Sequence, residues 1–303
     1  MSLTYISQQI VVYSGIIFLI LGIFGNTMNA YVFSSVTAYR QVPSTFYFLV
    51  QSIFESIFLI INLLPRVIAF SYGYDFTSVS PQWCKLRQAI LTISGSVSIT
   101  VICLCAVDQY LVTSSNAAFR HMSRIKVSYR ILLAVIIFWC LHSIPFYLYF
   151  DISPITRTCG SLNAALTIYL PIYFVLMFWV FPMLITSVFG RLTYRNIRQT
   201  IALADQRADR QLIKMTFSEL IRTLVCCTPL ATFHIYNTIT SGIAKDQDRI
   251  LKEYLAYTII SSIATFQYVS SFFIFLFSSS RFRRRVKGSL YFKQQTNSIV
   301  PTI

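Results

Sequence analysis

Seven long apolar stretches alternate with short polar segments along the chain. They lie at about 10–36, 45–70, 86–112, 130–150, 164–190, 215–240 and 254–278. A hydrocarbon core about 30 Å thick takes ~20 helical residues to cross, so each stretch is long enough to span a membrane. Residues 1–39 contain no charged side chain, whereas a helix at a water interface would show a polar face. The pattern predicts an all-helical membrane protein, a single seven-helix domain with seven spans.

The composition agrees with this prediction. Hydrophobic residues make up 55% of the chain and charged residues 12%, and the mean hydropathy is +0.63. A signal peptide would begin with basic residues and have a shorter apolar region. Residues 1–9 contain no Lys or Arg, so we interpret the first stretch as a retained membrane helix.

The basic residues predict the orientation of the helices. If the N-terminus is outside, most of the 25 Lys and Arg residues fall on inner loops and on a tail at 279–303. Cytoplasmic loops are enriched in these residues, which favours an outside N-terminus and an inside C-terminus. The net charge of +15 then reflects orientation and attraction to anionic lipid, not nucleic-acid binding. The basic run at 281–287 predicts a short amphipathic helix on the inner leaflet; the alternative is an unstructured polybasic tail.

Two of the seven cysteines, Cys84 and Cys159, fall outside in this arrangement. The outside is oxidising, so the pair can form a disulfide that ties the second outer loop to the helices. The alternative is two separate thiols. The other cysteines fall inside spans and are interpreted as small packing residues.

Motifs for enzymatic chemistry are missing from the sequence. There is no Gly-rich phosphate loop, no His-Glu-x-x-His and no Gly-x-Ser-x-Gly. With three His residues and few acids, we expect neither an enzyme nor a metal site.

Short motifs recur in order along the seven stretches. Cys84 lies 25 residues before Gln109, which is the centre of Asp108-Gln109-Tyr110. The other motifs are Gly25-Asn26, Trp139 with Pro145, Pro182, Cys226-Cys227-Thr228-Pro229 and Ser271-Phe272-Phe273-Ile274-Phe275. In this order and spacing the chain resembles a divergent rhodopsin-like (class A) G-protein-coupled receptor, and among these it is similar to peptide receptors. The resemblance implies a multi-pass plasma-membrane receptor that binds an extracellular ligand and signals through a heterotrimeric G protein.

The chain departs from the family at the positions that the resemblance assigns to coupling and switching. Gln109 replaces the Arg of Asp-Arg-Tyr, Cys227 replaces a Trp, and Phe275 replaces a Tyr. Gln cannot form the family's ion pair, so Asp108 is expected to lack its usual partner. The assigned positions are Asp108, Gln109, Tyr110, Cys227, Pro229 and Phe275.

Glu55 is an ionisable residue in the middle of the second stretch, which is costly in a membrane and indicates function. The resemblance places it in an internal polar cluster, which in many members holds a sodium ion. The cluster residues are Asn26, Glu55, Ser98, Gln267 and Ser271. Two interpretations are open: Glu55 helps to bind sodium, or a protonated Glu55 forms hydrogen bonds between helices.

Glu219 and Arg222 lie three residues apart in the sixth stretch and can pair on one helical face. In one interpretation the Arg side chain extends to the inner membrane interface. In the other, both residues face the cavity that opens on activation.

The resemblance places a ligand pocket in the outer thirds of the helices. Leu91 stands where amine receptors carry an Asp, which disfavours a monoamine ligand, and Thr265 stands where opsins carry the retinal-binding Lys, which argues against retinal. The predicted lining residues are Arg66, Gln88, Leu91, Thr92, Tyr169, Tyr173, His234, Asn237 and Tyr257. Cations and hydrogen-bond donors beside aromatic rings favour a peptide or an anionic small molecule.

Two other functions stay open. A seven-helix decoy or scaffold that has lost coupling would explain the missing Arg at position 109. A transporter or channel would usually show more charges within the membrane and more broken helices.

Overall fold

The computed structural model describes residues 2–35, 42–154, 156–199 and 207–297. The predicted last residue of the first span, 36, and the end of the predicted tail, 298–303, lie outside these residues.

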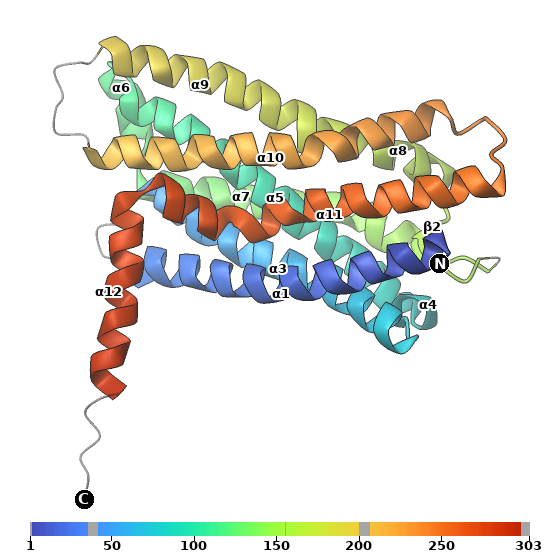
Figure 1. Cartoon of the computed structure of the whole chain (residues 1–303). Coiled ribbons are helices and arrows are strands. Elements are labelled where there is room, and N and C mark those ends of the chain that lie inside the picture. The colour runs from blue at the N-terminus through green and yellow to red at the C-terminus, as the bar shows by residue number, and fades with distance from the viewer. Residues whose placement is uncertain (1, 36–41, 155, 200–206, 298–303) are drawn as a thin grey trace, which may run out of the picture.

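Long helices form a bundle that contains the predicted stretches (Figure 1). They are α1 (Leu3–Ser35), α3 (Pro43–Tyr72), α5 (Pro81–Thr113), α7 (Ile125–Tyr149), α8 (Ala164–Val175) with its continuation α9 (Phe181–Gln199), α10 (Arg207–Ile239) and α11 (Gln247–Ser278). Several continue beyond the predicted bounds, because hydropathy marks only the part of a helix that crosses the hydrocarbon core.

Among the described residues, six helices are long and apolar enough to cross a membrane, with α8 and α9 taken as one. Helix α10 is not one of the six, and it carries Glu219 and Arg222 in its middle. It nevertheless packs against α5, α8, α9 and α11 as a member of the bundle. Glu219 and Arg222 are tolerated because they are buried among other helices and do not face lipid.

Close helix contacts depend on small residues and on one irregular turn. A Cβ atom on Gly25 of α1 would lie 2.9 Å from Cβ of Phe272, so this position lets α1 approach α11. Between α8 and α9 the chain forms one stretch of π-helix, η1 (Leu176–Val180). Such a segment widens the helix locally and is frequent at functional sites. Phe178 of η1 packs against Gly95 of α5.

The outer end of the bundle carries a disulfide between Cys84 and Cys159, with Cα atoms 5.7 Å apart. This confirms the predicted bond. It joins α5 to a small antiparallel sheet of β1 (Phe150–Ile152) and β2 (Cys159–Ser161). Lys85 adds an ion pair to Asp151 of β1 at 3.1 Å. The backbone N–H of Ile152, together with Lys85, lowers the pKa of the Asp151 carboxyl.

The opposite end of the bundle carries the short helices α6 (Ala117–Met122) and α12 (Ser280–Asn297), whereas the N-terminus and α4 (Phe76–Val79) lie at the disulfide end (Figure 1). Helix α12 turns away from the end of α11. Its Phe282 is buried, with ring centroids 5.5 Å from Phe33 and 5.7 Å from Phe275. The predicted amphipathic helix is therefore present, and aromatic packing fixes its first turn to the bundle.

We expect Cys84→Ser and Cys159→Ser each to lower cell-surface expression and the thermal unfolding temperature, because either change frees the second outer loop from α5. The matched control is Cys140→Ser, which removes a free, exposed cysteine and should behave as wild type. Non-reducing peptide mapping of the wild-type protein reports the bond directly. Recovery of Cys84 and Cys159 as alkylated free thiols would contradict it.

Candidate functional site

A cavity of ≈ 550 Å³ opens in the outer half of the bundle, lined by residues from α3, α5, α8, η1, α10 and α11 and from the segment around α4. The predicted pocket residues that line it are Arg66, Gln88, Leu91, Thr92, Tyr173, His234 and Tyr257. Its walls combine aromatic and aliphatic side chains with polar and charged ones. This combination is typical of small-molecule sites.

Two predicted pocket residues do not line the cavity. The Tyr169 hydroxyl lies 2.8 Å from Nε2 of His142 on the outer surface between α7 and α8. Tyr173, one turn further along α8, points into the bundle. Its hydroxyl forms a hydrogen bond with the hydroxyl of Ser96. Asn237 is exposed near the outer end of α10, and Lys245 Nζ donates to its side-chain oxygen at 3.5 Å.

The cavity has more cationic than anionic side chains. Arg66, Arg87 and His234 line it together with one carboxylate, Asp75. Sequence reasoning placed Arg87 at an outer helix end and missed its part in the cavity. The signal was its spacing of four residues from Leu91, which puts both on one face of a helix.

Existing contacts hold these charged side chains in place. Arg87 donates to the carbonyl of Ile61 at 3.2 Å and to the side-chain oxygen of Asn62 at 3.3 Å. Asp75 caps α4 and accepts from the Thr77 amide at 2.8 Å. The His234 ring stacks on Phe174 with centroids 5.2 Å apart. The cavity is therefore basic and largely pre-formed.

The floor of the cavity is formed by α10 and α11. Cys227, at the predicted switch position, lines the cavity, and its thiol donates to Oε1 of Gln267 at 3.1 Å. The Tyr268 ring stacks on Phe58 with centroids 3.9 Å apart. Pro229 lies within α10 two residues beyond Cys227. A ligand in the cavity would thus touch the part of α10 that lies just above the buried charges.

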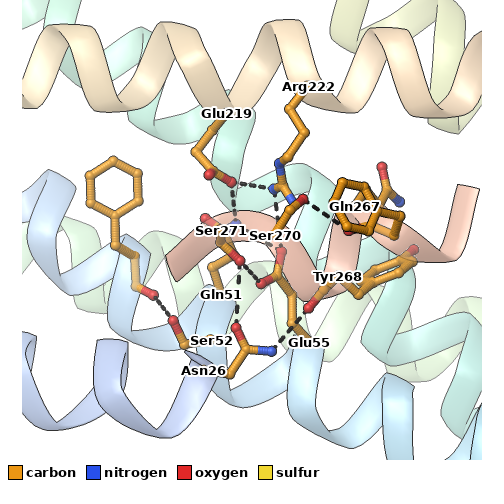
Figure 2. A network of polar contacts seen from close by, with 12 residues as sticks. Asn26, Gln51, Ser52, Glu55, Glu219, Arg222, Gln267, Tyr268, Ser270 and Ser271 are labelled. Atoms are coloured by element: carbon orange, nitrogen blue, oxygen red, sulfur yellow. Dashed lines mark hydrogen bonds and ion pairs between the residues drawn. The ribbon is translucent and has the colours of Figure 1, made fainter. Parts of the chain in front are cut away.

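A network of buried polar side chains lies below this floor, and Figure 2 shows Glu219 and Arg222 of α10 facing Gln51 and Glu55 of α3. The Gln51 amide nitrogen donates to both carboxyls, at 2.8 Å to Glu55 Oε1 and 2.8 Å to Glu219 Oε2. Arg222 pairs with Glu219, and its Nη2 lies 3.6 Å from Glu55 Oε1. Each of these residues is at most 7% exposed.

The network extends to α11 and α1 (Figure 2). The Ser271 hydroxyl donates to Glu55, and Arg222 Nη1 donates to the Ser270 hydroxyl at 3.3 Å. Asn26 donates to the carbonyl of Tyr268 at 3.0 Å. Of the predicted internal cluster, the structure thus brings Asn26, Glu55 and Ser271 together.

The other two members of that cluster, Gln267 and Ser98, form no hydrogen bond with Glu55 in the described part of the chain. The side-chain oxygen of Gln267 accepts a hydrogen bond from the Cys227 thiol and not from a group beside Glu55. The Ser98 hydroxyl is buried and has no hydrogen-bond partner in the described part of the chain. Sequence position alone did not show which way these side chains point.

The residues around Glu55 do not fit a bound sodium ion. The place beside Oε1 of Glu55 is taken by the guanidinium of Arg222, which already carries a positive charge. A sodium ion there would lie against a like charge, which raises its energy in a buried site. Within the described ranges, no group of three or more His, Cys, Asp or Glu side chains could hold a metal ion.

The expectation that Arg222 extends to the inner interface is wrong. Its side chain is 5% exposed and points into the bundle. The carboxyls of Glu55 and Glu219, buried at the same level, attract it more strongly than the distant interface does.

At the inner end of α5, Asp108 has hydroxyl partners. Ser44 of α3 and Ser123, which follows α6, both donate to its carboxyl, Ser123 at 2.5 Å. The Gln109 amide donates to the Ser44 hydroxyl at 2.6 Å. Asp108 thus lacks the Arg that is its usual partner in the family, and the hydroxyls of two serines bind its carboxyl instead. Tyr110 packs on Phe189 of α9, with ring centroids 5.7 Å apart.

Comparison with known proteins agrees with this architecture. The sequence model of the family described as 7 transmembrane receptor (rhodopsin family) matches residues 25–271. Over 125 residues the chain is 30% identical to a protein named "Rhodopsin, GQ-coupled" from Mizuhopecten yessoensis. That similarity covers 40% of this chain and 23% of the relative's length. Because the family model matches most of the chain, including the helices that carry the cavity and the network, the protein belongs to the rhodopsin family of seven-transmembrane receptors.

Proposed function

We propose that the protein is a plasma-membrane receptor that binds an extracellular ligand with an anionic group and signals through a heterotrimeric G protein. The observation that carries the proposal is the cavity of ≈ 550 Å³ lined by two guanidinium groups, those of Arg66 and Arg87, with Asp75 as the one acid of its lining. Guanidinium cations beside the aromatic and aliphatic part of the pocket select a ligand with a negative group and an apolar body.

The size of the cavity limits the ligand. Cavities of this volume enclose a drug-sized molecule or the end of a peptide. A peptide that inserts its C-terminal carboxylate and an apolar small molecule with one acidic group both meet these requirements. Thr265 lines the cavity at the position where the family's opsins carry the retinal-binding Lys. For this reason we propose a diffusible ligand, although the chain is similar to a rhodopsin.

The name of that relative gives a first partner to test. The protein from Mizuhopecten yessoensis is called GQ-coupled, so a Gq heterotrimer belongs in any panel. A second function, binding without coupling, is favoured by one observation: Gln109 is hydrogen-bonded to Ser44 where most of the family have an Arg.

Guanine-nucleotide exchange on purified G proteins separates the two functions. The receptor is reconstituted in lipid nanodiscs with Gq, Gi or Gs and exposed to a panel of free-carboxylate peptides, their amidated forms, lipophilic carboxylates and lipophilic amines. We expect exchange to rise with carboxylate-bearing members and not with their amidated or amine counterparts. Saturable binding without exchange on any of the G proteins would favour the non-coupling function.

We expect Arg66→Gln and Arg87→Gln each to weaken the first carboxylate agonist found by about 10- to 100-fold, since a hydrogen bond to a charged group contributes about 1.5–3 kcal/mol. Maximal signalling should be retained at high ligand concentration. The control is Lys252→Gln, which removes an exposed outer cation paired with Asp248. Equal potency of all the variants would show that the anionic group binds elsewhere.

Gln109→Arg should strengthen agonist-dependent exchange by on the order of fivefold, a typical coupling effect. The guanidinium can pair with Asp108 and can also reach a G protein at the inner end of the bundle, whereas the amide of Gln109 is hydrogen-bonded to Ser44. Gln109→Lys is the matched control, because it adds the charge without the planar fork of Arg and should gain less. Unchanged exchange at equal surface expression would count against coupling through this position.

A further inference from the structure

We propose that Arg222 is a built-in cation that takes the place of a bound sodium ion beside Glu55 and latches α10 to α3. The inference rests on which atoms surround the Glu55 carboxyl. Its Oε1 accepts from Gln51 at 2.8 Å and faces Arg222 Nη2 at 3.6 Å, and its other oxygen accepts from Ser271. The chain itself therefore supplies the positive charge and the donors.

The latch joins three helices at one level of the bundle. Arg222 and Glu219 come from α10, Glu55 and Gln51 from α3, and Ser270 from α11 (Figure 2). The contacts between α3 and α10 are the ones that a movement of α10 would break. Gln51 would lose Glu219, and Arg222 would lose Glu55. Because these groups are buried away from water, no solvent would replace the lost partners at once.

Helix α10 connects the latch with the ligand cavity. His234 and Cys227 of α10 line the cavity, and Arg222 lies further along the same helix toward the inner end. A ligand that pulls or rotates the outer part of α10 therefore acts on the latch directly. Pro229 lies between His234 and Arg222, where it removes one backbone hydrogen bond and lets the helix bend.

The charges of the network predict what happens without Arg222. Two carboxyls, Glu55 and Glu219, face one guanidinium. In Arg222→Gln, the two carboxyls would have the hydroxyl oxygen of Ser271 and the amide oxygen of Gln51 close by. No cation would lie between these oxygen atoms. Carboxylate, hydroxyl and amide oxygens are the ligands that hard cations prefer. The variant should therefore gain a sodium dependence that the wild-type protein lacks.

The first experiment measures the thermal unfolding temperature of the purified receptor and needs no G protein. Sodium chloride is exchanged for N-methyl-D-glucamine chloride at constant ionic strength. We expect no shift for wild type, stabilisation by sodium for Arg222→Gln, and loss of that stabilisation when Glu55→Gln is added. Ligand binding to the folded state alone raises stability in this way. The exposed control, Lys252→Gln, should stay insensitive to sodium.

The wild-type measurement tests the proposal even if Arg222→Gln fails to fold. Sodium-dependent stabilisation of the wild-type protein that Glu55→Gln abolishes would overturn it, because Glu55 would then bind an external cation despite Arg222. A folded Arg222→Gln that is insensitive to sodium would also overturn the assignment of this place to a cation.

The second experiment measures ligand-free nucleotide exchange and rests on the proposed function. If the latch restrains α10, Arg222→Gln and Glu55→Gln should each raise the basal exchange rate severalfold. The exchange rate of the double variant should be close to that of each single variant, because both substitutions remove the same contact. Lys252→Gln should match wild type. Additive increases, or no increase in a receptor that responds to agonist, would overturn the latch. Failure of all variants and agonists to drive exchange, with the sodium results as expected, would refute coupling and leave the cation assignment standing.

Discussion

The paired charge of Arg222 in the middle of the bundle is the constraint on which the arrangement of the helices depends. A guanidinium in the membrane interior must have partners, since an uncompensated charge there is expensive. The partners come from α10 itself and from α3, and serines of α11 complete the set. Helix α10, which is too polar to count as a membrane span by composition, is stable in the bundle because its polar residues meet these groups.

This constraint links the two ends of the receptor. Above the network lies a basic cavity whose floor includes Cys227 and Gln267. Below it, the inner ends of α3 and α5 are joined by Ser44, which bonds both Asp108 and Gln109. The chain therefore keeps polar contacts at the levels where its sequence departs from the family, but with different partners. Serine hydroxyls replace an ion pair at the inner end, and an arginine of the chain occupies the place of a diffusible ion in the middle.

The sequence was sufficient for features that depend on local composition and insufficient for those that depend on side-chain direction. Apolar length located the six spans that are apolar throughout. The outside location of Cys84 and Cys159 was enough to pair them. The direction of the Arg222 side chain could not be predicted, because the α3 residues that it and Glu219 meet are far away along the chain: Gln51 is 168 residues from Glu219. The spacing of three residues between Glu219 and Arg222 fits a pair that faces the membrane interface equally well. Likewise, Tyr169 and Tyr173 share one face of α8 and only Tyr173 lines the cavity, because it lies one turn deeper along the helix. Hydropathy does not report how deep the cavity begins.

The distance between the inner ends of α7 and α10 shows whether Arg222 holds α10 in place in the bundle. Spin labels placed at Lys126→Cys and Lys214→Cys, both exposed positions, in a Cys140→Ser background would report it by pulsed electron paramagnetic resonance without ligand or G protein. If Arg222 holds α10 in place, we expect one narrow distance distribution with Arg222 present and a second, separate population when Arg222→Gln is added. Identical distributions in the two folded proteins would show that Arg222 does not hold α10 in place.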